Sequence, residues 1–157
     1  MRVFSRHLPD STPTAVTLGS HPLHPMVVTF PIAFLMAAPV SDLAFVLTAD
    51  VFWARLSLWL TGAGAAMGGL AGIVGMAELL AIPTIRQRAA AWSHFVAAVT
   101  LLSVAFFNWF IRSSDPVGAV YPLGLGLSLL GASLVAVAGW IGGKLVFEHR
   151  VGVGAGR

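Results

Sequence analysis

Histidine has the widest chemical range of the side chains in this sequence, and four histidines lie beside or within long apolar stretches. A neutral imidazole can ligate haem iron or another metal ion, accept a hydrogen bond or relay a proton. The candidate ligands are His21 and His24 in the motif HPLHP, His94 within an apolar stretch, and His149 near the C-terminus. The chain has no cysteine, which excludes a thiolate metal site and covalent haem attachment through C-x-x-C-H.

Three chemical interpretations of these residues are open. In the first, two imidazoles from different segments, His94 with His24 or His21, are the axial ligands of a b-type haem. In the second, His94, Glu78 and another histidine such as His24 hold a non-haem metal ion. In the third, no cofactor binds, because Glu78 and His149 lie at helix ends and His94 hydrogen-bonds a neighbour. No nucleophile, base and orienting group can be assembled from the sequence, which argues against an enzyme acting on its own.

The composition indicates what kind of scaffold must position these side chains. The chain has 157 residues, of which 57% are hydrophobic and only 10% are charged, whereas a soluble domain carries about 25% charged residues. The Lys and Arg residues are dispersed without a basic run, so nucleic acid is not an expected partner. The sequence therefore predicts a single domain whose main solvent is the lipid bilayer.

Four stretches are apolar over the roughly 20 residues that a helix needs to cross the hydrocarbon core. They run from about Pro25 to Leu47, Phe52 to Ile82, Ala89 to Ile111 and Val117 to Gly143. Short connections make successive helices antiparallel neighbours. The predicted fold is therefore an all-α membrane protein, a four-transmembrane-helix antiparallel bundle over residues 21–150. A solvated arm (residues 1–20), which lacks the apolar core of a signal peptide, precedes it, and a glycine-rich tail (residues 151–157) follows.

Small residues indicate where the predicted helices touch. Two stripes have four-residue spacing: Gly64, Gly68 and Gly72 in the second helix, and Gly124, Ser128, Ala132 and Ala136 in the fourth. Such residues let helix backbones approach closely in lipid. Pro31 and Pro39 are expected to kink the first helix. The first and third helices share no evident pattern, so no internal repeat of the transporter type is expected.

Two further polar residues are expected inside the membrane. Asp42 lies near the outer end of the first helix, and Asn108 shares one face of the third helix with His94 and Leu101, because these three are seven residues apart. Polar and ionisable groups within a span are costly, so each is a candidate for function.

The distribution of Lys and Arg predicts the orientation of the bundle. The side that holds both termini and the second connection carries Arg2, Arg6, Arg86, Arg88, Lys144, Arg150 and Arg157, against Arg55 and Arg112 on the other side. Cytoplasmic flanks carry the excess of basic residues. Both termini are therefore expected in the cytoplasm, with the protein in a bacterial cytoplasmic membrane. Glu78 and the candidate histidines then converge toward the cytoplasmic side.

Three segments resemble a bacterial family of predicted membrane proteins, domain-of-unknown-function family 2231. They are HPLHPMVVTFPIAF near the start, AELLAIPTIRQRAAAWSHF in the middle and GWIGGKLVFEHRVGVGAG at the end, so the resemblance covers about residues 21–154. Members of that family often carry a histidine where this chain has Thr29. The resemblance implies a four-helix membrane domain, which in some relatives is fused to electron-transfer modules such as Rieske or cytochrome domains.

The expected function is that of a small membrane protein that binds b-type haem and passes electrons as a subunit or partner of a redox complex. The alternative is a cofactor-free structural or assembly subunit of a membrane complex, whose polar groups only stabilise helix contacts. The lipid bilayer is the expected environment in both cases, and the chain could associate with copies of itself.

Overall fold

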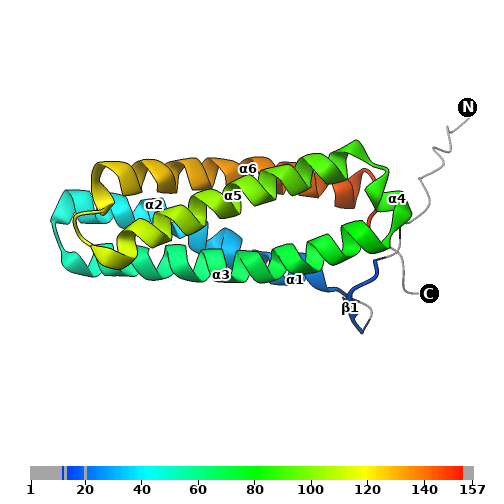
Figure 1. Cartoon of the computed structure of the whole chain (residues 1–157), viewed down its shortest axis with the longest axis horizontal. Helices are drawn as coiled ribbons and strands as arrows, with labels where there is room; N and C mark the ends of the chain where they lie inside the picture. The colour runs from blue at the N-terminus through cyan, green and yellow to red at the C-terminus, as the bar shows by residue number, and fades with distance from the viewer. Residues whose placement is uncertain (1–11, 13, 20, 154–157) are drawn as a thin grey trace, which may run out of the picture.

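Four long helices form an antiparallel bundle in the computed structural model, which describes residues 12, 14–19 and 21–153 (Figure 1). The elements in chain order are β1 (Thr17–Leu18), β2 (His21–Pro22), α1 (Leu23–Val27), α2 (Thr29–Thr48), α3 (Val51–Ala81), α4 (Pro83–Arg86), α5 (Ala89–Ser114), the π-helical turn η1 (Val120–Gly124) and α6 (Leu125–Phe147). The predicted arm and tail lie mostly outside the described residues.

The four predicted spans are confirmed as helices long and apolar enough to cross a membrane. They cover Leu23–Thr48, Val51–Ala81, Ala89–Ser114 and Val120–Phe147, with mean hydropathy between 1.5 and 1.9. Their limits differ from the predicted ones by a few residues at most ends. The 31 residues of α3 correspond to about 46 Å of helix, more than the roughly 30 Å hydrocarbon core requires. The ends of α3 therefore reach into the interface or the helix is tilted.

The first span is interrupted where Pro31 interferes with the helix. A proline ring clashes with the carbonyl group four residues earlier, and for Pro31 that residue is Val27, at which α1 ends before α2 begins at Thr29. The break between α1 and α2 at Val28 is consistent with the kink predicted at Pro31. Pro39 lies inside α2 without ending the helix.

The bundle is a ring of four helices in which α2 packs on α3 and α6, and α5 packs on α3 and α6. α2 and α5 therefore lie on one diagonal, and α3 and α6 on the other. Thr12 and Gly152 join the two described ends of the chain, because Gly152 N donates a hydrogen bond of 2.9 Å to Thr12 O. These ends lie at the same end of the bundle as α4 (Figure 1). We call this the α4 end, and the end with the α2–α3 and α5–η1 connections the far end.

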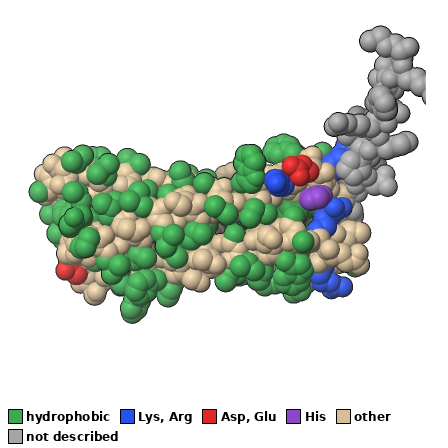
Figure 2. Space-filling model, turned by 90° about the horizontal axis from the view of Figure 1, so that it is seen from above, with side chains coloured by type: hydrophobic (Ala, Val, Ile, Leu, Met, Phe, Trp, Pro, Cys, Tyr) green, Lys and Arg blue, Asp and Glu red, His purple; other side chains and the backbone are tan. Residues whose placement is uncertain are grey.

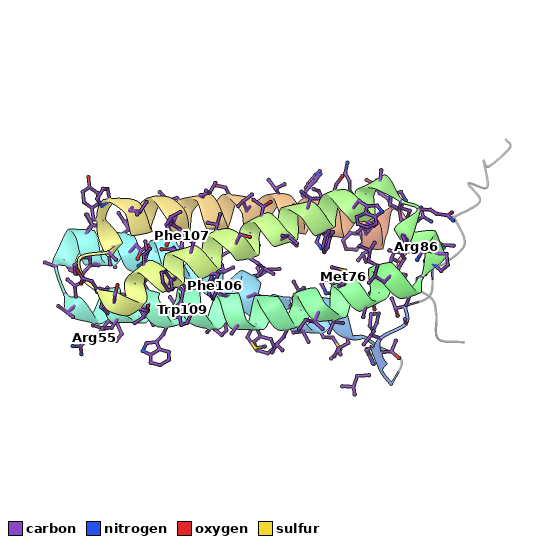
Figure 3. All side chains as sticks on the ribbon, viewed as in Figure 1. Arg55, Met76, Arg86, Phe106, Phe107 and Trp109 are labelled. Atoms are coloured by element: carbon purple, nitrogen blue, oxygen red, sulfur yellow. The ribbon has the colours of Figure 1, made fainter. Side chains whose placement is uncertain are left out.

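The surface of the bundle suits lipid rather than water. Large apolar side chains are exposed along its length, among them Trp59, Ile73, Val96 and Trp140. Figure 2 shows apolar side chains over the long sides of the visible face, with Lys, Arg and His gathered toward one end. Figure 3 shows Arg86 at one end of the bundle and Arg55 at the other.

Small residues line the interior, as the stripe in α3 predicted. Gly64 and Gly68 are buried, and a Cβ atom at Gly68 would lie 2.5 Å from Leu102 Cδ2 of α5. The stripe predicted in the fourth helix is only partly internal: Ser128 is buried in α6, whereas Ala136 is exposed.

The two halves of the bundle share a pattern of buried residues, which the comparison of the first and third predicted helices did not reveal. In the second half, the positions Gly124, Ser128, Gly131, Val135 and Ala138 have the same spacing as Ser57, Thr61, Gly64, Gly68 and Ala71 in the first. Likewise Ala105, Asn108 and Arg112 of α5 match Leu35, Ala38 and Asp42 of α2. The residues GASLVAVAGWIG (131–142) also resemble GAAMGGLAGIVG (64–75). Since α2 and α5 run in the same direction on one diagonal, the halves are related by an approximate twofold axis along the bundle.

Candidate functional site

Two of the predicted ligands, His24 and His94, face each other inside the α4 end of the bundle. His24 belongs to α1 and His94 to α5, which places the two imidazoles on the diagonal that crosses the interior. Their ring centroids are 6.2 Å apart and their planes are nearly perpendicular, at 89°. Both side chains are partly buried. The histidine pair is therefore the meeting point of the two repeated halves at this end.

Each imidazole is held by a backbone carbonyl group of the span that follows its own span in the chain. His24 Nδ1 lies 2.9 Å from Ala71 O in α3, and His94 Nδ1 lies 3.0 Å from Ala138 O in α6. A carbonyl oxygen only accepts, so Nδ1 carries the proton and donates it in both rings. Each neutral ring then has an unprotonated Nε2 with a free lone pair, the form of imidazole that ligates metals.

Glycine makes the hydrogen bond between each imidazole and its carbonyl group possible. The residue four positions after the carbonyl group lies directly beside that group on the helix surface, and a side chain there would occupy the space of the imidazole. Those residues are Gly75 and Gly142. A Cβ atom at Gly75 would lie 3.0 Å from His24 Cε1, and a Cβ atom at Gly142 would lie 3.0 Å from His94 Cε1. The similar sequences AGIVG (71–75) and AGWIG (138–142) therefore each supply the accepting carbonyl group and the glycine beside it for one imidazole. We call each of these pairs an imidazole seat. This repeat was the sequence signal that would have paired the two histidines.

The other candidate residues at the α4 end do not join this pair. His21 is exposed on β2, and His149 Nδ1 lies 3.0 Å from Arg88 Nη1. Glu78 is buried in α3 near its end, and its Oε1 has no hydrogen-bond partner among the described residues. Within the described part of the chain, no group of three His, Cys, Asp or Glu side chains could hold a metal ion. The set of His94, Glu78 and a third ligand is thus not assembled.

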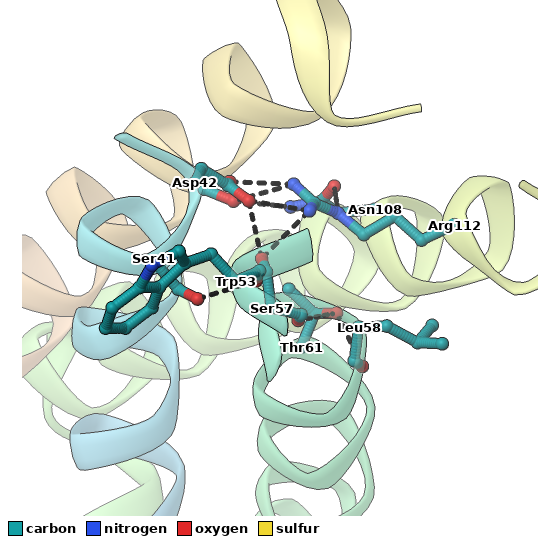
Figure 4. Close-up of polar contacts among 9 residues, drawn as sticks. Ser41, Asp42, Trp53, Ser57, Leu58, Thr61, Asn108 and Arg112 are labelled. Carbon is teal, nitrogen blue, oxygen red and sulfur yellow. Dashed lines mark hydrogen bonds and ion pairs between the residues drawn. The ribbon is translucent and has the colours of Figure 1, made fainter. Parts of the chain in front are cut away.

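A second polar cluster, which joins all four long helices, lies inside the far end of the bundle (Figure 4). Asp42 of α2 and Arg112 of α5 form an ion pair in which neither side chain is exposed. Arg112 Nη1 donates to Asp42 Oδ1 at 2.7 Å, and Nη2 donates to Asp42 Oδ2 at 2.8 Å. We call this pair, with Ser57 of α3, Asn108 of α5 and Ser128 of α6, the far-end network.

Every donor of the Arg112 guanidinium group has an acceptor in this network. Nε donates to Asn108 Oδ1 at 2.8 Å, while Nη1 and Nη2 donate also to Ser57 Oγ at 2.8 Å and Ser128 Oγ at 3.2 Å. Ser57 Oγ in turn donates to Asp42 Oδ1 at 2.6 Å. An arginine has five N–H donors, so none is left for a ligand. The geometry is that of a closed structural cluster.

Arg112 is the residue that the sequence analysis placed wrongly. It was counted among the basic residues of the outer flank, but its side chain points into the bundle and is completely buried. One spacing could have found it: Asp42 follows His24, and Arg112 follows His94, by the same 18 positions (24 to 42 and 94 to 112). Asp42 and Arg112 are thus equivalent positions of the two halves, as His24 and His94 are.

The two clusters differ in what they can do. The far-end network pairs its charges and donors internally, whereas the histidine pair presents two Nε2 atoms for which no hydrogen bond is recorded among the described residues. The two imidazoles, one from each half, therefore each leave one ring nitrogen without a recorded hydrogen bond among the described residues.

One family model matches the chain, over residues 20–155, and its description is predicted membrane protein (DUF2231). No curated protein and no solved structure matches the chain.

Proposed function

The chain belongs to the DUF2231 family of predicted membrane proteins, and we propose that this membrane protein carries electrons on one b-type haem held between His24 and His94.

The distance between the two imidazoles is the observation that carries the proposal. A low-spin haem iron takes two axial imidazoles on opposite faces of the porphyrin. With metal–nitrogen bonds of about 2 Å and a ring centroid about 1 Å behind each nitrogen, the centroids are about 6 Å apart. The rings of His24 and His94 are 6.2 Å apart. Imidazoles bent toward a tetrahedral ion would lie closer together, so the spacing favours opposite axial positions.

The orientation of the rings adds independent support. A ligating imidazole usually donates its other N–H to a carbonyl or carboxylate group, which fixes the tautomer and the ring plane. Both histidines do so, through Ala71 O and Ala138 O. The ligands come from equivalent positions in two repeated halves, as expected for one cofactor bound on the axis between them.

We place the haem on the cytoplasmic side of a bacterial cytoplasmic membrane. The α4 end carries the described basic residues Arg86, Arg88, Lys144 and Arg150, whereas Arg55 is the exposed basic residue near the far end, and cytoplasmic flanks are rich in such residues. The far-end network has no imidazole among its members. One haem at one end cannot carry electrons across the whole bilayer, so the partner is a redox subunit that docks at the α4 end.

Absorption spectroscopy of the purified protein tests this proposal. Protein from haem-replete cells is purified in detergent and measured oxidised and then reduced with dithionite. We expect sharp low-spin bands after reduction, which His24→Ala and His94→Ala each abolish or broaden. His21→Ala and His149→Ala are the matched controls and retain the bands, because these side chains lie outside the pair. Wild-type protein without haem bands would refute the proposal.

A cofactor-free structural or assembly subunit is the second candidate, and the far-end network favours it. This network stabilises the contacts of all four helices without any ligand. On that hypothesis the purified protein is colourless, and His94→Ala lowers only its stability, through the lost hydrogen bond to Ala138 O.

A further inference from the structure

We infer that Glu78 takes up a proton when the haem is reduced, which links electron uptake to proton uptake at the α4 end. The inference rests on the proposed haem site, and it assigns a role to a buried carboxyl group that neither ligation nor helix packing explains.

The surroundings of Glu78 favour a carboxyl group that changes its protonation. Its residue is only 7% exposed, and Oε1 has no hydrogen-bond partner among the described residues. An ionised carboxylate is costly at such a place unless it is paired. The described ion pair of the chain is Asp42–Arg112, so the charge of Glu78 is not neutralised by an adjacent cation within the described residues.

The helix geometry of α3 places Glu78 close to the histidine pair. Glu78 lies three residues after Gly75, and residues at this spacing are neighbours on one helix face, with about 5–6 Å between their Cβ positions. The Cβ position of Gly75 is itself 3.0 Å from His24 Cε1. The backbone of Glu78 therefore lies about one helical turn from the position that faces His24, on the side that leads toward the α4 end.

Glu78 is also a position at which the two repeated halves differ. Ala71 and Gly75 correspond to Ala138 and Gly142 in the second half. By the same spacing, the position equivalent to Glu78 is Leu145 of α6. Leu145 packs in the apolar cluster of Leu79, Ile85 and Ala91. In the second half, leucine at the equivalent position serves packing alone. Packing therefore does not explain why the first half has an ionisable carboxyl group at Glu78.

The other ionisable groups at this end are engaged or exposed, apart from Arg88 Nε, which is buried without a hydrogen-bond partner among the described residues. The neighbouring elements contribute His24 (α1), Arg86 (α4), Arg88 and His94 (start of α5), and Lys144, Glu148, His149 and Arg150 (end of α6), with His21 exposed on β2. Arg86 Nη1 donates to Leu80 O, and Arg88 Nη1 contacts His149 Nδ1. His24 and His94 donate to carbonyl groups. Glu78 is therefore the buried carboxyl group that can respond to the charge of the haem.

The coupled step balances as one electron and one proton. A one-electron donor, dithionite in the test, reduces ferric to ferrous haem, and the site gains one negative charge. The Glu78 carboxylate then takes one proton from water at the α4 end and becomes a neutral carboxylic acid. Net charge in the buried region is unchanged, which is what a low-dielectric interior favours.

Redox titration of the holoprotein in detergent between about pH 5 and pH 8 tests the inference. Uptake of one proton per electron makes each tenfold change in proton concentration equivalent to about 59 mV. We expect the midpoint potential of the wild type to fall with rising pH and to approach this slope. In Glu78→Gln the slope is lost while the haem bands remain. Glu148→Gln, at the exposed end of α6, is the matched control and keeps the wild-type slope.

Infrared difference spectra give a second measurement, made on the wild type and on Glu78→Gln. Reduction of the wild type should produce the carbonyl band of a protonated carboxylic acid, and Glu78→Gln should lack it. A pH-independent midpoint in the wild type, or a full slope in Glu78→Gln, overturns the inference and leaves the haem proposal intact. Protein without haem bands overturns both.

Discussion

Asp42 and Arg112, which are 70 residues apart in the chain, form a bidentate ion pair inside the far end of the bundle. Neither side chain is exposed, and the contact joins the first repeated half to the second. The pairing of both carboxylate oxygens with both guanidinium nitrogens fixes the rotation of α2 relative to α5 as well as their distance.

Removal of one member of this pair should destabilise the protein strongly. Asp42→Ala leaves the Arg112 charge buried without a partner, which costs about 3–5 kcal/mol in buried pairs. Thermal unfolding in detergent, followed by circular dichroism, measures the effect. The double variant Asp42→Ala/Arg112→Leu should unfold at a higher temperature than Asp42→Ala, because no unpaired charge remains.

Arg55→Ala is the control for that experiment, since Arg55 is an exposed arginine near the same end of the bundle. It should change the unfolding temperature little. Equal losses in Arg55→Ala and Asp42→Ala would show that burial of the ion pair contributes nothing.

Alanine at either imidazole seat should weaken haem binding. A Cβ atom at Gly75 or Gly142 comes within 3.0 Å of the ring it faces, and displaces the imidazole from its carbonyl acceptor. Changes to the partners that orient a metal ligand typically cost about 10–100-fold in affinity. We expect similar losses for Gly75→Ala and Gly142→Ala, measured by haem titration of the apoprotein.

Gly139→Ala is the matched control, because a Cβ atom at Gly139 meets nothing within 4 Å although it lies in the same sequence motif. It should bind haem like the wild type. A loss at Gly75 without one at Gly142 would contradict the twofold relation of the two seats.

The interior stripe of α3 can be tested with two adjacent glycines. Gly68→Ala places Cβ 2.5 Å from Leu102 Cδ2, whereas Gly69→Ala places it in open space. The end of the Leu102 side chain must move to admit this Cβ atom, so the cost should lie near the lower end of the about 1–3 kcal/mol typical of overpacking, and only Gly68→Ala should lower the unfolding temperature. If both variants unfold with the wild type, α3 and α5 are not in close contact at this level.

Topology reporters test the orientation of the bundle. Tags at the N- and C-termini should both report the cytoplasm, because the basic residues flank the α4 end. A reporter in the connection after α5, at residues 115–119, should report the outside. Termini that label on opposite sides would contradict the four-span bundle itself.

Hydrophobic length was sufficient to predict the fold from the sequence. Each span is long enough to cross the bilayer, and the short links leave antiparallel packing as the simplest arrangement. Kinks were predicted at Pro31 and Pro39: α1 ends four residues before Pro31, at Val27, whereas α2 continues through Pro39.

The candidate site was only partly predictable, because its geometry depends on contacts between helices. His24 and His21 looked equivalent in HPLHP, and only the start of α1 at Leu23 separates them: His24 lies on the helix and His21 before it. Arg112 looked like a flank charge, since long arginine side chains near helix ends usually extend to the interface. Its partner is 70 residues away and could not be read from local pattern.

The twofold relation of the halves restricts how such a chain can have arisen. Two identical hairpins would bring identical residues together on the axis, which suits His24 and His94 but would set two aspartates or two arginines against each other at the far end. Such like charges repel in a low-dielectric interior. A pair of opposite charges requires that the halves differ, and joining them in one polypeptide guarantees one of each in every molecule. The charge pair therefore belongs to the fused chain, whereas the histidine pair is compatible with an older dimer of hairpins.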